Sequence, residues 1–321
     1  MRTIPGALAL AVCVACSGSF GDRSGVPGTS LEPSNGPAPS IGDCPVFPAD
    51  NDWNRDISGD PIDTRSGAYM AYMGAGSLKL HANFGSNPTY GLPYAVVSGT
   101  QPRLPMQFLY ASQSDPGPYP YPEDVPIQAG QDSTGDRHAI VIDKDNCLLY
   151  ETWDTHWLGT GLGYRAGAGA VFNLRTGAPR PDGWTSATAS GLPEFAGLVR
   201  YEEATSGEIR HALAFTAGMA ARAWVHPGTH YGNSLDSNAP PMATRVRLDA
   251  SFDVTRYTGL TRTILVALQH YGMFLIDEST TAFVGVSGTK DSRWPDADLE
   301  QLKTVPMSAF QVVQLPAIHQ Q

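Results

Sequence analysis

The sequence predicts a mainly β fold, a β-sandwich or jelly-roll-like single domain with one or two peripheral helices. Short runs of β-branched and aromatic residues are separated by turn-forming residues, and 34 Gly and 26 Pro are spread over 321 residues. The apolar spacing of a convincing helix occurs at 260–271, and a second, short helix is expected at 297–303. Strands that outnumber helices in this way favour packed β-sheets with helices at their margin.

Residues 1–15 are expected to form a secretory signal peptide. Arg2 precedes an apolar run that is too short for a membrane-spanning helix, which needs about 20 apolar residues. The residues around Cys16 are small and resemble a bacterial lipoprotein box, so Cys16 is a candidate lipidation site. Cys13 stands where such boxes usually carry Leu, and ordinary cleavage is the alternative.

Residues 16–42 are rich in Ser, Gly and Pro and carry few large apolar groups. They cannot bury enough surface to order themselves, so a disordered tether is expected there, followed by one β-rich domain over 43–321. Cys44 and Cys147 are the cysteines left for this domain. Export to an oxidising compartment would allow them to form a disulfide, and two free buried thiols are the alternative.

The domain resembles a family of uncharacterised secreted bacterial proteins. The resemblance rests on CPVFPADNDWN, DRHAIVIDKDNCLLYE, GWTSATASGLPEFAGLVRYEE and ALQHYGMFLID, and it runs from about residue 44 to residue 313. It implies a single domain and an exported location. The family brings no established activity, so no residue role is implied by it.

The segment 184–216 contains the densest group of titratable side chains. Residues 198–202 and 209–215 are predicted to be two strands joined by a short turn, as a hairpin. Side chains alternate between the faces of a strand, so His211 would lie on the apolar face. This His is either a catalytic group or a buried residue with one local partner.

A second hairpin is predicted at 137–143 and 147–153, with a polar turn between its strands. His138 shares one face of the first strand with Ile140 and Ile142. We therefore expect His138 and His211 to point into one cleft, with Glu202 or Glu208 beside them.

Several function classes are disfavoured. The net charge is −10 and no basic run is present, so nucleic acid is an unexpected partner. The motifs of serine hydrolases, zinc proteases and dinucleotide enzymes are absent. His226 and His230 have the i, i+4 spacing of a helical metal site, but Pro227 interrupts that helix, and no metal or cofactor is predicted.

The remaining carboxylates, imidazoles and aromatics favour an exported enzyme that cleaves a polysaccharide. A hydrolase would use the pair Glu202 and Glu208, whereas a lyase would use Tyr201 or His211 as base, with Arg200 or Arg210 on a uronate carboxylate. The predicted catalytic residues are Glu202, Glu208, His211, Tyr201 and His138. The predicted substrate-binding residues are Arg200, Arg210, Trp184, Tyr119, Tyr121 and His230.

Two alternatives stay open. One is a glycan-binding surface lipoprotein without catalysis, held at the membrane only by an N-terminal lipid. The other is a metal-dependent hydrolase that uses His138, His211, His230 and an Asp. The protein would lie in the periplasm or on the outer surface, or be secreted.

Overall fold

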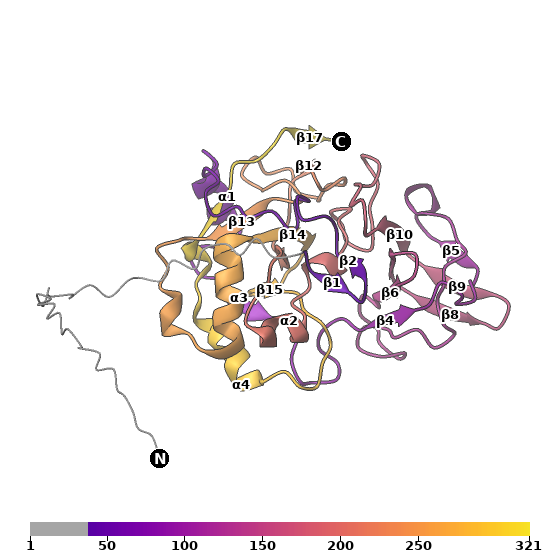
Figure 1. The fold of residues 1–321 in the computed structure, drawn as a ribbon. Helices are drawn as coiled ribbons and strands as arrows, with labels where there is room; N and C mark the ends of the chain where they lie inside the picture. Colours follow the sequence, from indigo (N-terminus) through magenta and orange to yellow (C-terminus); the bar gives the residue numbers. More distant parts are fainter. Residues whose placement is uncertain (1–37) are drawn as a thin grey trace, which may run out of the picture. The chain divides into compact units, whose positions relative to one another are not determined.

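Six strands form the largest sheet, in the order β16-β13-β14-β11-β15-β3. Its strands β13, β14 and β15 are labelled in Figure 1. The computed structural model describes residues 38–321, and all statements below concern this part of the chain. The sheet is mixed, because β11 runs parallel to β14 but antiparallel to β15. Its strands are β3 (Leu80–Ala82), β11 (Leu213–Ala217), β13 (Arg245–Leu248), β14 (Met273–Glu278), β15 (Val284–Val286) and β16 (Phe310–Val312).

Four strands form the second sheet, in the order β10-β7-β6-β4. They are β4 (Tyr94–Val97), β6 (Ala139–Asp143), β7 (Leu148–Trp153) and β10 (Ala168–Asn173). β6 and β7 pair antiparallel with Ala139 opposite Thr152, which confirms the predicted hairpin at 137–153. The Asp143 carboxylate accepts the backbone N–H of Asn146 at 3.1 Å and so closes the polar turn between the two strands.

A disulfide joins Cys44 to Cys147, as predicted. It connects β2 (Cys44–Pro45), which pairs with β1 (Ser40–Ile41), to the residue before β7. Disulfides persist in oxidising compartments, so this bond suggests an exported protein. The candidate lipidation site Cys16 lies outside the described residues.

A three-stranded sheet, β5-β9-β8, covers a smaller core. Its strands are β5 (Met106–Phe108), β8 (His156–Gly159) and β9 (Gly163–Ala166). Tyr119 and Tyr121 are fully buried in this core, where their rings meet edge to face at 5.7 Å. The prediction that these two tyrosines bind the substrate is therefore wrong.

The predicted helix at 260–271 is confirmed as α3 (Gly259–His270), which packs against β13. Gly272 ends it with a φ of 64°, and a Cβ there would lie 2.3 Å from the Val246 carbonyl oxygen. Only glycine suits that position, because other residues rarely adopt positive φ. The second predicted helix appears as α4 (Asp296–Leu299), continued by the 3-10 turn Glu300–Thr304.

The predicted hairpin across 198–215 is wrong, because its first strand is replaced by the helix α2 (Tyr201–Ser206). Glu202 and Glu203 lie in the first turn, where carboxylates are favoured by the helix dipole. Gly207 follows with a φ of 91°, as a left-handed residue that ends a helix. Local helix signals therefore outweighed the short alternation of apolar and polar residues.

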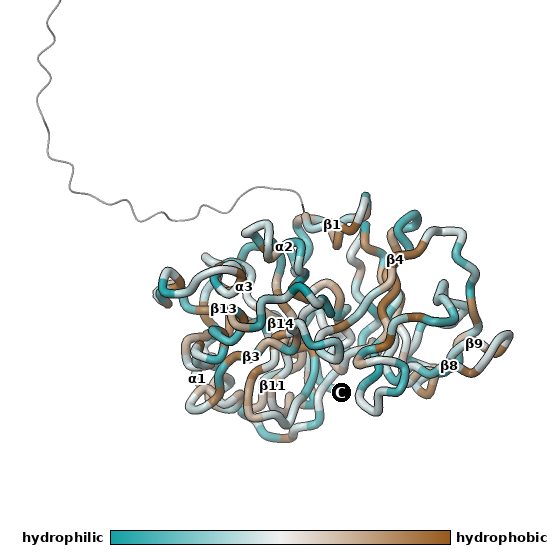
Figure 2. The backbone as a smooth tube through the Cα atoms, turned by 90° about the horizontal axis from the view of Figure 1, so that it is seen from below, coloured by the Kyte–Doolittle hydropathy of each residue, from teal (hydrophilic) through white to brown (hydrophobic). Residues whose placement is uncertain are grey.

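The described residues contain one further α-helix, α1 (Ser66–Tyr72), and a two-stranded sheet of β12 (Ala223–Val225) and β17 (Ile318–Gln320). The remaining 3-10 turns are Ala111–Gln113, Phe195–Gly197, Val254–Arg256 and Met307–Ala309. The fold is mainly β with few helices, as predicted, and its strands fall into several sheets. Hydrophobic stretches of the backbone coincide with strands such as β4 (Figure 2). Among the described helices, none has the length and apolarity needed to cross a membrane.

Candidate active site

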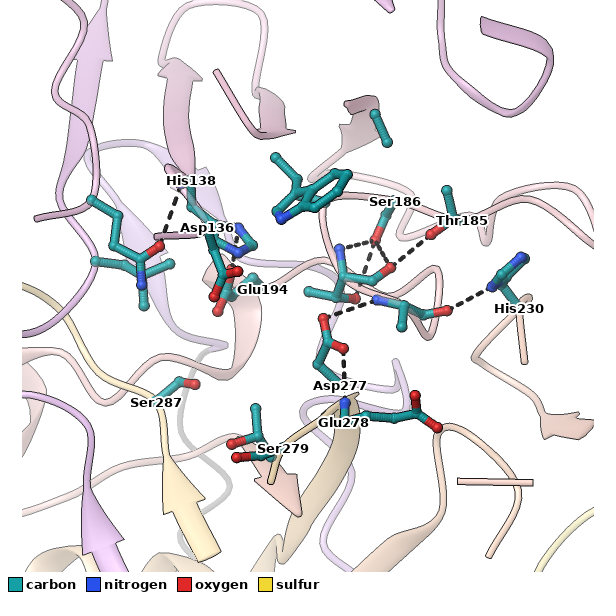
Figure 3. A pocket seen from close by; sticks show the side chains of 18 of the residues that line it. Asp136, His138, Thr185, Ser186, Glu194, His230, Asp277, Glu278, Ser279 and Ser287 are labelled. Atoms are coloured by element: carbon teal, nitrogen blue, oxygen red, sulfur yellow. Dashed lines mark hydrogen bonds and ion pairs between the residues drawn. The ribbon is translucent and has the colours of Figure 1, made fainter. Parts of the chain in front are cut away.

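A cavity of about 710 Å³ is lined by residues from both large sheets. His138 immediately precedes β6 and Trp153 ends β7, while Asp277 and Glu278 end β14. The segment between β10 and α2 contributes a run of small polar residues from Thr185 onward. Figure 3 shows that these groups converge on one space from separate elements.

A buried ion pair forms one side of the cavity. His138 Nδ1 lies 2.9 Å from Glu194 Oε2, and each side chain is only 8% exposed. Burial lowers the pKa of His138, but the Glu194 carboxylate outweighs that effect and raises it to about 9. His138 is therefore an imidazolium at neutral pH, and within the described residues its Nε2 has no hydrogen-bonding partner.

Glu151 lies behind this pair and fixes its position. Its carboxylate is fully buried in β7 and accepts the backbone N–H groups of Glu194 at 2.9 Å and Phe195 at 2.8 Å. Burial raises the pKa of Glu151 to about 7, against the opposing effect of these two hydrogen bonds. The strand β7 thereby determines where the Glu194 carboxylate meets His138.

Asp277 forms another side of the cavity, away from the His138 pair (Figure 3). Its carboxylate accepts the backbone N–H of Glu278 at 2.7 Å and that of Ala189 at 3.2 Å. Burial raises the pKa of Asp277 to about 6, while the charge of His138 lowers it and that of Glu194 raises it. The three side chains are thus close enough to influence each other's ionisation.

His230 presents a different kind of group. Its Nδ1 lies 2.9 Å from the Ala189 carbonyl oxygen, which can only accept, so Nδ1 carries the proton. Burial lowers the pKa of His230, so the ring is neutral at physiological pH. Its Nε2 is then an acceptor, suited to a hydroxyl donor.

The hydroxyl-rich segment 185–190 is bonded within itself. Ser186 Oγ donates to the Leu192 carbonyl oxygen at 2.7 Å, and Thr188 Oγ1 lies 3.0 Å from Ser190 Oγ. These hydroxyls shape the wall of the cavity. None of them is bonded to His138, so they do not form the activated serine of a nucleophilic triad.

Two stacked ring pairs also line the cavity. The rings of Tyr110 and Trp153 lie 6.5 Å apart, and those of His230 and Tyr231 lie 4.2 Å apart. Ring faces of this kind pack against the apolar faces of planar or cyclic ligands. The cavity therefore combines the acid–base groups of His138 and Asp277 with aromatic surface.

The charge of the lining is negative. Its acidic residues are Asp136, Glu194, Asp277 and Glu278, and none of the described lining residues is Lys or Arg. The imidazolium of His138 is paired within the wall. An anionic ligand would meet uncompensated repulsion here, whereas a neutral polyhydroxylated ligand would find donors and acceptors.

The structure brings together only part of the predicted site. His138 and His230 line the cavity, as expected of site residues, but His211 does not. The His211 ring is fully buried between Glu203 Oε2 at 3.1 Å and the Ala212 carbonyl oxygen at 2.8 Å. The prediction that His211 shares a cleft with His138 is wrong, and both of its ring nitrogens have local partners.

The other predicted residues of the 198–210 segment also lie outside the cavity lining. Glu202 is exposed on α2 and pairs with Arg293 at 2.5 Å, and the Arg293 guanidinium stacks on Tyr201. Glu208 pairs with Arg210 at 2.5 Å. These side chains stabilise the surface of α2 and the turn that follows it.

Two further predicted ligand-binding residues are part of the packing. Arg200 donates to the Phe195 carbonyl oxygen at 3.1 Å and to Glu203 at 2.7 Å. The Trp184 ring packs beneath the Arg180 guanidinium, 5.4 Å away, and is not among the residues that line the cavity. Neither side chain is placed to contact a ligand there.

Sequence reasoning missed Glu194 and did not single out Asp277. Glu194 follows Pro193 in a turn without periodic pattern, so nothing local marks it as a partner of His138. Asp277 does carry a signal, because it ends the apolar run of β14, where polar side chains often reach a site.

Comparison with protein-family models, with curated proteins and with solved structures found no match to this chain.

Proposed function

We propose that this protein is a carbohydrate-active hydrolase whose cavity binds a neutral glycan and cleaves it by acid–base chemistry. The observation that carries the proposal is the buried His138–Glu194 ion pair, which shares one cavity with Asp277. A general base must be ionised and a general acid protonated at the working pH. Here burial raises the pKa of Asp277 to about 6, and the Glu194 carboxylate raises that of His138 to about 9.

The two groups have complementary charge states between pH 6 and pH 9, because Asp277 is ionised there and His138 is protonated. His138 would donate its Nε2 proton to the glycosidic oxygen as the bond from that oxygen to the anomeric carbon breaks. Asp277 would accept a proton from the water that attacks the anomeric carbon. Proton exchange with solvent then restores both groups.

The lining favours a neutral glycan over a polyuronate. A lyase needs a cation to neutralise the uronate carboxylate, and the described lining has four acidic residues and no Arg or Lys. The neutral His230 can accept a hydrogen bond from a sugar hydroxyl, and the paired rings of Tyr110 and Trp153 offer a face for a pyranose ring. The lining therefore supports hydrolysis of a neutral glycan better than lyase cleavage of a polyuronate.

The test is a screen of neutral polysaccharides and polyuronates with wild type, Asp277→Asn and His138→Gln. Glu202→Gln is the matched control, because it removes an exposed carboxylate outside the cavity. We expect cleavage of a neutral glycan that both cavity variants lose while their circular dichroism is unchanged. Cleavage that survives both substitutions, or cleavage of polyuronates alone, would refute the proposal.

A glycan-binding protein without catalysis is the second candidate, and the Tyr110–Trp153 pair favours it. Tyr110 is 47% exposed, as expected of an aromatic that meets a ligand from solvent. Binding of a glycan without any cleavage, lost in Trp153→Ala but kept in Asp277→Asn, would identify this function.

We also propose that the protein is exported and anchored through a lipid on Cys16. The Cys44–Cys147 disulfide supports an oxidising compartment. Mass spectrometry of the mature protein tests this, because cleavage and acylation at Cys16 give a defined mass. An intact N-terminal Met would refute export with cleavage.

A further inference from the structure

A group of three potential metal ligands lies outside the cavity. Asp182 comes from the turn before Trp184, His226 follows β12, and His319 lies in β17. One ligand atom from each residue lies within 4.8 Å of the other two. None of the three residues lines the proposed active site.

The spacing fits a bound transition metal better than a hydrogen bond. His226 Nε2 lies 3.4 Å from Asp182 Oδ1. In a tetrahedral zinc site with bonds of about 2.0–2.2 Å, two ligand atoms are about 3.3–3.6 Å apart. A hydrogen bond between a ring nitrogen and a carboxylate is shorter, as in His156–Asp154 at 2.6 Å. The two atoms therefore stand at the edge length of a coordination tetrahedron.

The surrounding structure holds the two rings in place. His319 pairs with Trp224 across β12 and β17, and the two rings stack at 5.5 Å. The His226 ring meets the His319 ring edge to face at 4.6 Å. The rings therefore approach each other through the pairing of two strands, which limits their rearrangement on binding.

The turn that carries Asp182 is tied to the same region. The backbone N–H of Gly183 donates to the Thr229 carbonyl oxygen at 2.7 Å, and that of Trp184 donates to Pro181 at 3.0 Å. Asp182 thus stands beside the segment that contains His226 because of backbone bonds, and its position does not depend on the pairing of the two charges.

We propose that Asp182, His226 and His319 bind a divalent transition metal of the zinc type. Two imidazoles and one carboxylate suit Zn²⁺, whereas Ca²⁺ and Mg²⁺ prefer oxygen ligands. Three protein ligands leave a fourth position for water in a tetrahedral site. The side chains of His226 and Asp182 are 41% and 51% exposed, so the metal would enter from solvent.

Metal binding would have a structural consequence. It would connect β17 and the end of β12 to the 181–184 turn, which leads directly into the cavity wall at Thr185. A ligand that binds only the folded chain stabilises it in proportion to the logarithm of its concentration. Metal binding would therefore stabilise the folded structure next to the cavity, and the metal would take no part in the chemistry of the cavity.

The test is titration of chelator-treated protein with Zn²⁺ by calorimetry, and with Co²⁺ by visible absorption. We expect one ion per chain, a tetrahedral Co²⁺ spectrum and a higher melting temperature with Zn²⁺. His226→Ala, His319→Ala and Asp182→Asn should each weaken binding at least tenfold. Binding should weaken at acid pH, because protons compete for the imidazoles, and excess Ca²⁺ should not displace Zn²⁺.

His156→Ala is the matched control, because it removes a partly exposed histidine that is also paired with an aspartate but lacks a second histidine. It should bind Zn²⁺ as wild type does. Asp182→Asn keeps the test valid if a histidine variant fails to fold, since its side chain is half exposed. No Zn²⁺ binding by wild type, or binding unchanged in all three ligand variants, would overturn the proposal.

Discussion

The backbone N–H of Glu194 donates a 2.9 Å hydrogen bond to the buried carboxylate of Glu151. Glu194, the partner of His138, is therefore held in position through its main chain by the strand β7. Glu151 is a positioning residue, since it lies behind the pair and does not line the cavity.

Glu151→Gln tests this positioning role. Burial raises the pKa of Glu151 from 4.5 to about 7 in the folded protein, so the folded state binds more protons than the unfolded state between these values. Its contribution to the free energy of unfolding is present below pH 4.5 and is lost as the pH rises through 7. In wild type this loss should reach about 3 kcal/mol.

Urea denaturation of wild type and Glu151→Gln at pH 5 and pH 8 measures the difference. The variant should lack this part of the pH dependence, and its activity should fall because a Gln side chain cannot accept both N–H groups. Equal pH dependence in the two proteins would contradict the raised pKa.

The pH profile of cleavage should be bell-shaped. Activity should rise as Asp277 loses its proton near pH 6 and fall as His138 loses its proton near pH 9. The measurement is kcat/KM on the neutral glycan from pH 4 to pH 10. Glu278→Gln, which keeps Asp277, should retain the limb near pH 6. A profile that is flat from pH 5 to pH 8 would exclude Asp277 as the base.

Glu194→Gln should shift the basic limb of that profile to lower pH. Burial alone lowers the pKa of His138, and without the Glu194 carboxylate nothing of similar strength opposes it. We expect kcat at neutral pH to fall by about 10²-fold or more, because the acid is no longer protonated. NMR titration of the His138 ring gives the pKa directly, with Glu202→Gln as control. An unchanged pKa would contradict the ion pair.

Glu203→Gln should destabilise the protein without affecting turnover by folded molecules. Burial raises the pKa of Glu203, but Arg200 and His211 outweigh it and bring it down to about 2. Its contribution to stability is therefore present above pH 4.5 and is lost as the pH falls toward 2. Breaking this partly buried cluster should cost about 2–4 kcal/mol at pH 7.

Chemical denaturation and activity per folded molecule check this prediction, and Glu202→Gln should change stability by less than about 0.5 kcal/mol. Loss of turnover in Glu203→Gln with unchanged stability would indicate that the active site lies in the segment around α2 and not in the cavity.

Removal of the disulfide should lower stability strongly. Cys44 and Cys147 are 103 residues apart, and a crosslink over such a loop restricts the unfolded chain. Reduction, or the double change Cys44→Ser and Cys147→Ser, should cost about 2–5 kcal/mol in urea denaturation. A midpoint unchanged by reductant would show that the bond adds nothing to stability.

The elements that sequence reasoning found are those with strong local patterns. The hairpin at 137–153 has two apolar runs around a polar turn, and α3 has a full apolar stripe. The segment at 198–215 has neither, and its helix α2 rests on two acidic residues and one glycine. The alternation of apolar and polar residues was too short there to decide between strand and helix.

The candidate site was harder to predict because its partners are distant in sequence. His138 was identified, but its partner Glu194 lies in a turn whose position depends on the buried Glu151 of another strand. His211 is of a residue type that is common in active sites, yet its Nε2 is bonded to Glu203, which α2 places beside it. Both outcomes follow from tertiary contacts that no local pattern encodes.

The cavity is assembled from residues between Asn83 and Ser287. His138 and Asp277, the proposed acid and base, are held by different sheets and are far apart in sequence, so neither sheet holds both groups by itself. Asp277 comes into place only when β14 pairs with β11 in the six-stranded sheet. Activity should therefore require both large sheets to be folded, and a chain with only one of them formed should show none.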